Sequence, residues 1–299
     1  MESITRQSIM TESACYQTGR TITPKGIMVH STATPGLTAE QLRSRWNSRD
    51  ANAAVHAILD ETEGIQTLPW KHRGWHAGTG TSGKSANNTH ISFECCEPYE
   101  CRLLPVEWLA LKRGGKNNTA WAVRRLQEEL TARGYDPKGI DGKFGPGCEE
   151  AVKAFQRDAG LAVDGSCGSA TRAALAAREG SYLRYDPAKV SSYFEAVWER
   201  AVALCAQLCT AYGIDPDTGI ICHSEGHEQG IASNHADVLH WWPEHGKNMD
   251  DFRAAVRSAM AGTQDVRTLV QERFGLTGAE VEHLAQFAGL LEKLAGGKA

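Results

Sequence analysis

Gly26-Ile27-Met28-Val29-His30 is an apolar run that ends in an imidazole, and Gly219-Ile220-Ile221-Cys222-His223 repeats that arrangement far along the chain. Both runs predict buried strands. A strand with a histidine at its open end is suited to present a metal ligand. Zinc needs three protein groups and one open position to activate water. His30 and His223 are therefore candidate ligands, and Asp237, which follows the second run, is a candidate third.

Size and composition limit the classes of function. The 299 residues can hold one large or two modest domains with a substantial core. A net charge of −4 and the lack of a dense basic run argue against a nucleic-acid-binding surface. No apolar stretch is long enough to span a membrane, and residues 1–6 lack the apolar core of a signal peptide. We therefore expect a protein that folds in a cytosol, with its nine cysteines reduced and mostly buried.

Other segments predict strands and helices around the two histidine runs. Residues 1–25 are expected to be irregular. The expected strands cover 53–60, 65–69 and 90–95, and the expected helices cover 38–46, 187–212 and 249–260. Residues 263–297 predict two or three short helices broken at Gly275 and Gly289. Their apolar positions need a partner surface, so this tail is expected to form a small appendage or to mediate self-association.

The middle of the chain has a different pattern. Residues 121–133 predict an amphipathic helix. Asp141-Gly142-Lys143-Phe144-Gly145 and Asp164-Gly165-Ser166-Cys167-Gly168 then each precede a further helix, so the motif D-G-x-x-G occurs twice. Glycine permits the positive φ of a tight turn, and aspartate can accept hydrogen bonds from the amides of that turn. This small internal repeat predicts a three-helix unit between the two histidine strands.

Five fragments outside this unit occur in an order that resembles a known enzyme family. They are Val29-His30-Ser31-Thr32-Ala33, His56-Ala57-Ile58-Leu59-Asp60, Trp75-His76-Ala77-Gly78, Ile91-Ser92-Phe93-Glu94 and Cys222-His223-Ser224-Glu225. Together they resemble the zinc-dependent N-acetylmuramoyl-L-alanine amidases, which share a fold with peptidoglycan recognition proteins. The resemblance implies an α/β fold with a mixed central sheet flanked by helices, built from residues 20–112 and 181–261.

The middle unit resembles the small helical peptidoglycan-binding domain of many cell-wall hydrolases. The resemblance rests on Val123-Arg124-Arg125-Leu126-Gln127, residues 139–145, Ala151-Val152-Lys153-Ala154-Phe155-Gln156 and Val163-Asp164-Gly165. We expect this domain to cover 117–178 as an insertion into the amidase domain, because insertions are tolerated where chain ends lie close together. Residues 263–299 would then form a helical C-terminal appendage.

The amidase resemblance implies hydrolysis of the amide between the lactyl carbonyl of N-acetylmuramic acid and L-alanine. Zn²⁺ would lower the pKa of a bound water to about 7 and polarise the carbonyl. Zinc suits these ligands better than magnesium or calcium does, because they are rich in imidazole. His30 and His223 are the expected ligands.

The candidates for the third ligand all lie in one loop region. They are His227, His235, Asp237, His240 and His245. In the family this ligand is an aspartate or a cysteine, with a basic residue two positions earlier. His235-Ala236-Asp237 fits that spacing, and His235, His240 and His245 remain alternatives. With Asp237 as the ligand, His235 takes the basic position and would stabilise the developing oxyanion.

The remaining site expectations concern proton transfer and sugar binding. Glu94 matches the general base of part of the family and could pass the proton of the water to the leaving amine. Trp75 and His76 could line the groove. Trp241 and Trp242 could stack on a sugar face, or each could simply pack in the core. His56 is expected to pack behind the site instead of binding metal.

Three functions are compatible with these residues. The first is a wall-lysing amidase acting as a phage or prophage endolysin, which would stay in the cytoplasm of the bacterial host until released to the cell wall. The second is a non-catalytic peptidoglycan receptor, which would be expected to lack one metal ligand. The third is a zinc peptidase cutting another stem-peptide bond, since the groove and not the metal selects the bond. All three take bacterial peptidoglycan as the partner.

Overall fold

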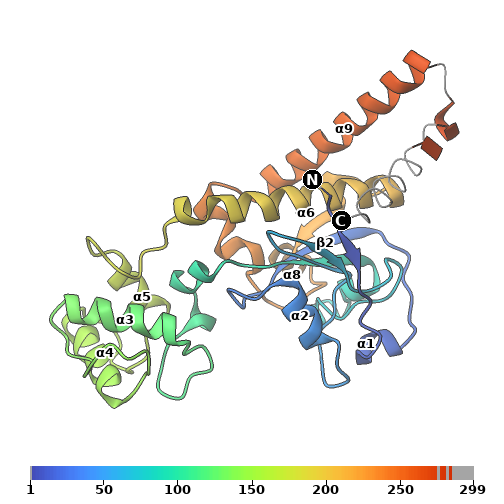
Figure 1. Ribbon diagram of the computed structural model, residues 1–299. Coiled ribbons are helices and arrows are strands. Elements are labelled where there is room, and N and C mark those ends of the chain that lie inside the picture. The colour runs from blue at the N-terminus through green and yellow to red at the C-terminus, as the bar shows by residue number, and fades with distance from the viewer. Residues whose placement is uncertain (1, 275–276, 281–282, 285–299) are drawn as a thin grey trace, which may run out of the picture.

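A computed structural model describes residues 2–274, 277–280 and 283–284 (Figure 1). Its centre is a six-stranded mixed sheet in the order β1-β4-β3-β5-β2-β6. The β3–β4 pair is antiparallel and the other neighbours are parallel. The strands are β1 (Arg6–Gln7), β2 (Gly26–Ser31), β3 (Ala57–Leu59), β4 (Gly64–Gln66), β5 (His90–Cys95) and β6 (Ile220–Cys222). The expected α/β class with a mixed sheet is confirmed.

Strand β2 lies between β5 and β6 and is buried along its whole length. In the register with β5, His30 lies beside Glu94. In the register with β6, Val29 lies beside Cys222, so that His223 follows at the same edge of the sheet. Parallel strands therefore bring His30, Glu94 and His223 to one edge, at their carboxyl ends.

Several expected boundaries are wrong by a few residues. The strands expected at 53–60 and 65–69 are shorter, and His223 begins helix α8 (His223–Glu228) instead of ending a strand. The N-terminal 25 residues are not all irregular, since they include β1 and α1 (Ala14–Gln17). Strand β1 forms because it pairs with β4. This long-range contact cannot be predicted from the residues around β1.

Capping residues mark where two of the main helices begin or end. Helix α2 (Ala39–Trp46) begins with a capping box in which Thr38 and Gln41 exchange hydrogen bonds. Helix α6 (Ser191–Tyr212) follows the 3₁₀ turn η4 (Pro187–Val190) and ends at Gly213, whose φ is 65°. The short helix α7 (Pro216–Gly219) leads into β6. The other 3₁₀ turns are η1 (Ala86–Asn88), η2 (Tyr99–Leu103), η3 (Glu107–Leu109), η5 (Asp237–His240) and η6 (Trp242–His245).

Helix α9 (Met249–Phe274) differs from expectation, because it continues through Gly262 and across the expected boundary between 261 and 263. It packs against α6 at its start and projects away from the sheet in Figure 1. The expectation of self-association falls in part on positions outside the described residues, which are 275–276, 281–282 and 285–297. No helix in the described ranges is long and apolar enough to cross a membrane.

Helices α3 (Ala120–Ala132), α4 (Pro146–Asp158) and α5 (Ser169–Ala176) form a separate group, drawn in green to yellow in Figure 1. The internal repeat has a structural cause. The Gln127 side chain donates to Asp141 and accepts from the Gly142 amide, and Gln156 does the same with Asp164 and Gly165. Each D-G turn is thus fastened to the preceding helix by one glutamine.

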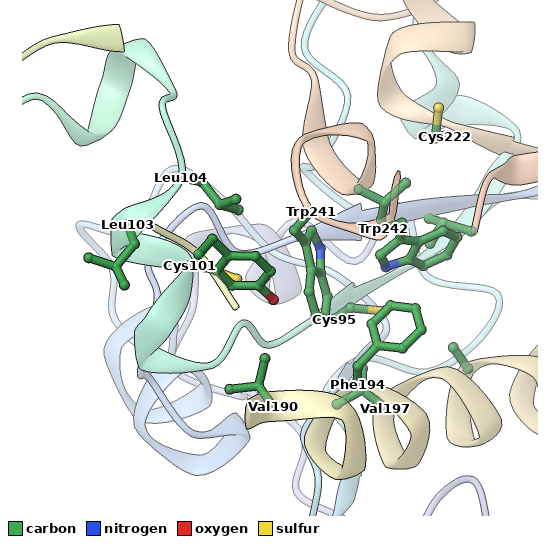
Figure 2. Close-up of a cluster of buried hydrophobic side chains, with 14 of the residues drawn as sticks. Cys95, Cys101, Leu103, Leu104, Val190, Phe194, Val197, Cys222, Trp241 and Trp242 are labelled. Atoms are coloured by element: carbon green, nitrogen blue, oxygen red, sulfur yellow. The ribbon is translucent and has the colours of Figure 1, made fainter. Parts of the chain in front are cut away.

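Two residues predicted to bind sugar lie in the hydrophobic core beside the sheet. Trp241 and Trp242 are 0% and 1% exposed, and Figure 2 shows both beside Phe194 and Val197 of α6. The Phe194 ring contacts Trp241 edge-on at 5.4 Å between centroids. The prediction that these tryptophans stack on a sugar is wrong, because burial leaves no face for a ligand.

All nine cysteines are free and buried, as expected.

Candidate metal centre and catalytic site

Three side chains converge at the carboxyl edge of the sheet. Asp237 Oδ2 lies 2.9 Å from His30 Nδ1 and 2.9 Å from His223 Nδ1. The two Nδ1 atoms are 3.2 Å apart. Among the described residues, these three form the group whose donor atoms lie close enough to hold one metal ion.

The triangle fits a tetrahedral zinc ion. Two ligands at zinc–nitrogen and zinc–oxygen distances of about 2.0–2.1 Å, separated by the tetrahedral angle, lie about 3.3 Å from each other. The observed edges of 2.9, 2.9 and 3.2 Å are close to that separation. Two imidazoles and one carboxylate leave a fourth position for water, as in zinc hydrolases.

The outer nitrogens of both histidines have hydrogen-bonding partners. His30 Nε2 is 3.0 Å from His76 Nδ1, and His223 Nε2 is 3.2 Å from the hydroxyl oxygen of Ser233. If each Nδ1 lone pair faces a metal, each Nε2 carries the proton and donates it to these partners. Such bonds fix the tautomer and orientation of ligating histidines. His76 therefore lies in contact with His30, and its expected place in the lining of the groove stays a prediction.

The charges of the cluster suit metal binding. Burial lowers the pKa of His30, which keeps the ring neutral and its lone pair available. Burial alone would raise the pKa of Asp237, but His30 and His223 outweigh that effect and hold the pKa below its ordinary value. The cluster is therefore a carboxylate between two imidazoles.

Glu94 lies beside this cluster. It is buried, and its Oε2 atom has no hydrogen-bond partner among the described residues. Burial, together with the carboxylates of Asp237 and Glu97, raises the pKa of Glu94 well above its usual value. A carboxyl group with raised proton affinity and a free oxygen is suited to general acid–base chemistry.

The competing third ligands lie elsewhere. His240 is directed toward Glu97, and the His245 ring stacks on Phe194 at 4.0 Å between centroids. His227 Nδ1 lies 3.3 Å from the Ala232 carbonyl oxygen. His235 is exposed, with its ring centroid 4.7 Å from that of His223, so it lies at the edge of the site without joining the donor triangle.

Comparison with known proteins gives two family matches. Residues 20–143 match the N-acetylmuramoyl-L-alanine amidase family, and residues 120–175 match the peptidoglycan binding domain family. The chain is thus similar to an amidase family over residues 20–143 and to a peptidoglycan binding domain family over residues 120–175. The amidase match includes His30 and Glu94, whereas His223 and Asp237 lie beyond its end. The pairing of β6 with β2 brings the latter two residues to His30, inside the matched region.

Two curated relatives of this chain come from Bacillus species. N-acetylmuramoyl-L-alanine amidase XlyA of Bacillus subtilis (strain 168) is 34% identical over 93 residues, which is 30% of this chain and 31% of XlyA. N-acetylmuramoyl-L-alanine amidase CwlL of Bacillus licheniformis is 46% identical over 69 residues, 22% of this chain and 18% of CwlL. The chain thus spans less than a third of the length of these two relatives. Among solved structures, Staphylococcus aureus hydrolase AmiA aligns with 87% of this chain and 84% of its own, at 15% identity and a TM-score of 0.47.

The structure also places the residues expected behind or around the metal site. His56 is fully buried, with Nε2 2.7 Å from the His72 carbonyl oxygen and Nδ1 accepting from the Ser92 amide, so it packs in the core as predicted. Trp75 is half-buried and packs against a small cluster that includes Met10 and Leu68. A role for Trp75 in substrate binding stays a prediction.

Sequence reasoning missed the polar residue Glu97 and considered its partner His240 only as an alternative metal ligand. Glu97 is 0% exposed, and its Oε1 lies 3.1 Å from Nε2 of the buried His240 ring. Burial lowers the pKa of His240, but Glu97 more than compensates, so that the net shift is upward. The available signal was weak. Glu97 lies two positions past the end of β5, and its partner lies far away in sequence.

Proposed function

We propose that the chain hydrolyses the amide bond between N-acetylmuramic acid and L-alanine in peptidoglycan, in a zinc-dependent reaction. The observation that carries this proposal is the donor triangle of His30, His223 and Asp237, with Glu94 beside it. The match of residues 20–143 to the amidase family supports the choice of bond.

Each residue has a distinct part in this proposal. His30, His223 and Asp237 would hold the zinc ion, which when bound supplies Lewis acidity and an acidified water. Glu94 would accept the proton of the attacking water on its free Oε2 and deliver it to the leaving amine. His235 at the exposed edge would donate a hydrogen bond to the carbonyl oxygen as negative charge develops there.

We assign the amidase domain to two segments, 20–112 and 181–261, with the peptidoglycan-binding domain at 117–178 inserted between them. The support is that strands from both segments pair in one sheet. The inserted domain would hold the enzyme on its polymeric substrate, which raises the local concentration of scissile bonds. The pairing of wall binding with wall hydrolysis supports a further proposal, cell-wall lysis as a phage or prophage endolysin reaching the wall from the host cytoplasm.

Digestion of purified peptidoglycan, with and without a chelator, tests the activity. Mass analysis should find glycan with free lactyl groups and peptides that begin with L-alanine, and the chelator should abolish both products. Cleavage within the stem peptide would show a zinc peptidase instead. Binding to peptidoglycan without any product would show a receptor.

A further inference from the structure

Asp237 occupies an unusual backbone conformation for a metal ligand. Its φ is +43°, in the left-handed region that non-glycine residues rarely adopt. Ala33, in the loop that follows the His30 strand, has a φ of +44°. Such conformations persist where the surrounding structure holds them, and they cluster at functional sites. The groups that hold Asp237 are therefore part of the metal site.

One buried carboxylate, that of Glu97, contacts Ala33 directly and is linked to Asp237 through His240. Glu97 Oε1 accepts a hydrogen bond of 2.8 Å from the Ala33 amide, and the same oxygen lies 3.1 Å from His240 Nε2. On its other side, His240 Nδ1 donates to the backbone carbonyl of Asp237. The contacts form a continuous path from the loop after His30, through Glu97 and His240, to Asp237.

The path is sealed from solvent. The side chains of Glu97 and His240 are 0% and 2% exposed. The Trp108 ring packs edge-on against His240 at 5.4 Å between centroids. A buried ion pair adds little net stability compared with apolar packing, so its energetic benefit does not explain its presence here.

We infer that Glu97 and His240 are positioning residues, which hold Asp237 in its left-handed conformation and so place the third zinc ligand beside His30 and His223. This inference rests on the proposed metal site and extends it beyond the donor atoms. Without the pair, Asp237 would relax toward negative φ and its carboxylate would leave the triangle. The two histidines alone would then bind zinc weakly.

Zinc affinity of the full-length chain, measured by competition with a chromophoric chelator after metal removal, tests the inference. Glu97→Gln should weaken zinc binding about 10- to 100-fold, the usual effect of altering a partner of a metal ligand. The absorption spectrum of the Co²⁺-loaded variant should change as well, because it reports the number and geometry of ligands.

Glu129→Gln is the matched control. Glu129 is a carboxylate with 0% exposure that pairs with Arg133 and accepts from the Tyr182 amide, within the inserted domain. Its substitution should lower the thermal stability of the metal-free chain without changing zinc affinity or the cobalt spectrum. The same pattern from Glu97→Gln would overturn the inference and leave Glu97 a purely structural residue.

Two substitutions at His240 keep the test decisive if Glu97→Gln does not fold. His240→Asn retains a donor near the position of Nδ1 and should keep most of the affinity. His240→Leu retains bulk without a donor and should lose affinity as Glu97→Gln does. Equal zinc affinity in both variants would contradict the inference. If the unaltered chain itself binds no zinc, the proposed metal site is wrong, which is a different failure from an unchanged variant.

Discussion

His30 Nδ1 and Asp237 Oδ2 lie 2.9 Å apart although 207 positions separate the two residues in the sequence. The helices α3, α4 and α5 lie within that interval of the sequence. The segments before and after them still form one sheet, because β6 pairs with β2. The site therefore depends on the long-range pairing of two segments of the chain. Substitution of one ligand at a time tests the site.

Asp237→Ala should abolish tight zinc binding and reduce turnover by at least 100-fold, since two imidazoles do not complete the ligand set. Metal analysis after dialysis and peptidoglycan digestion are the two measurements. His245→Ala is a useful control, because that ring packs on Phe194 away from the triangle. An Asp237→Ala chain that keeps one zinc ion would assign the third ligand elsewhere.

Glu94→Gln should retain zinc but lose turnover by about 10²–10⁴-fold, because the amide cannot accept the proton of the water. The substitution also removes a buried carboxyl whose pKa is raised by burial and by neighbouring carboxylates, so we expect no loss of thermal stability. The measurements are zinc content, the thermal unfolding midpoint and the rate of peptidoglycan digestion. Turnover near that of the unaltered enzyme would remove Glu94 from the mechanism.

Stability should fall in mild acid, because His56 is held neutral in the core. Burial lowers the pKa of His56 from 6.5 to about 4, so between these values the unfolded chain binds a proton that the folded chain does not. The free energy of unfolding therefore decreases as the pH falls through this window, by up to about 3 kcal/mol for this residue. Burial also lowers the pKa of His90 to about 4, which acts in the same direction.

Unfolding by urea at pH 7 and at pH 4.5 checks this dependence. His56→Gln should be less stable than the unaltered chain at pH 7, since the hydrogen bonds of the ring are altered, but it should lose less on acidification. Equal acid losses in the two proteins would mean that His56 is not held neutral.

Trp241→Ala should destabilise the chain by about 3–5 kcal/mol, the usual cost of deleting a buried aromatic ring. If the variant remains folded, its affinity for soluble glycan fragments should be unchanged, because the ring has no exposed face. Unfolding curves and a binding titration measure the two effects. Weaker glycan binding without loss of stability would restore the sugar-stacking role.

Local signals predicted much of this structure. The helices expected at 38–46 and 187–212 and the two apolar runs ending in His30 and His223 are all readable from neighbouring residues. The repeated D-G turn likewise identified the helical domain. Each of these features depends on contacts within one element or one turn.

Long-range contacts account for what was missed. Strand β1 exists because β4 is beside it, and Trp241 is buried because α6 covers it. The link between Glu97 and His240 joins residues far apart in sequence, and neither stands in a motif. The sequence alone does not distinguish a histidine that binds metal from one that contacts a metal ligand. Only the fold could therefore distinguish Asp237 from the neighbouring histidines as the candidate third ligand.

The proposed reaction depends most directly on one zinc ion bound by three side chains. Anomalous scattering from crystals of the zinc-loaded chain, recorded on both sides of the zinc edge, locates the ion without assumptions. We predict a single strong peak about 2.0–2.2 Å from His30 Nδ1, His223 Nδ1 and Asp237 Oδ2. A peak held by other side chains, or no peak in zinc-saturated crystals, would contradict the account.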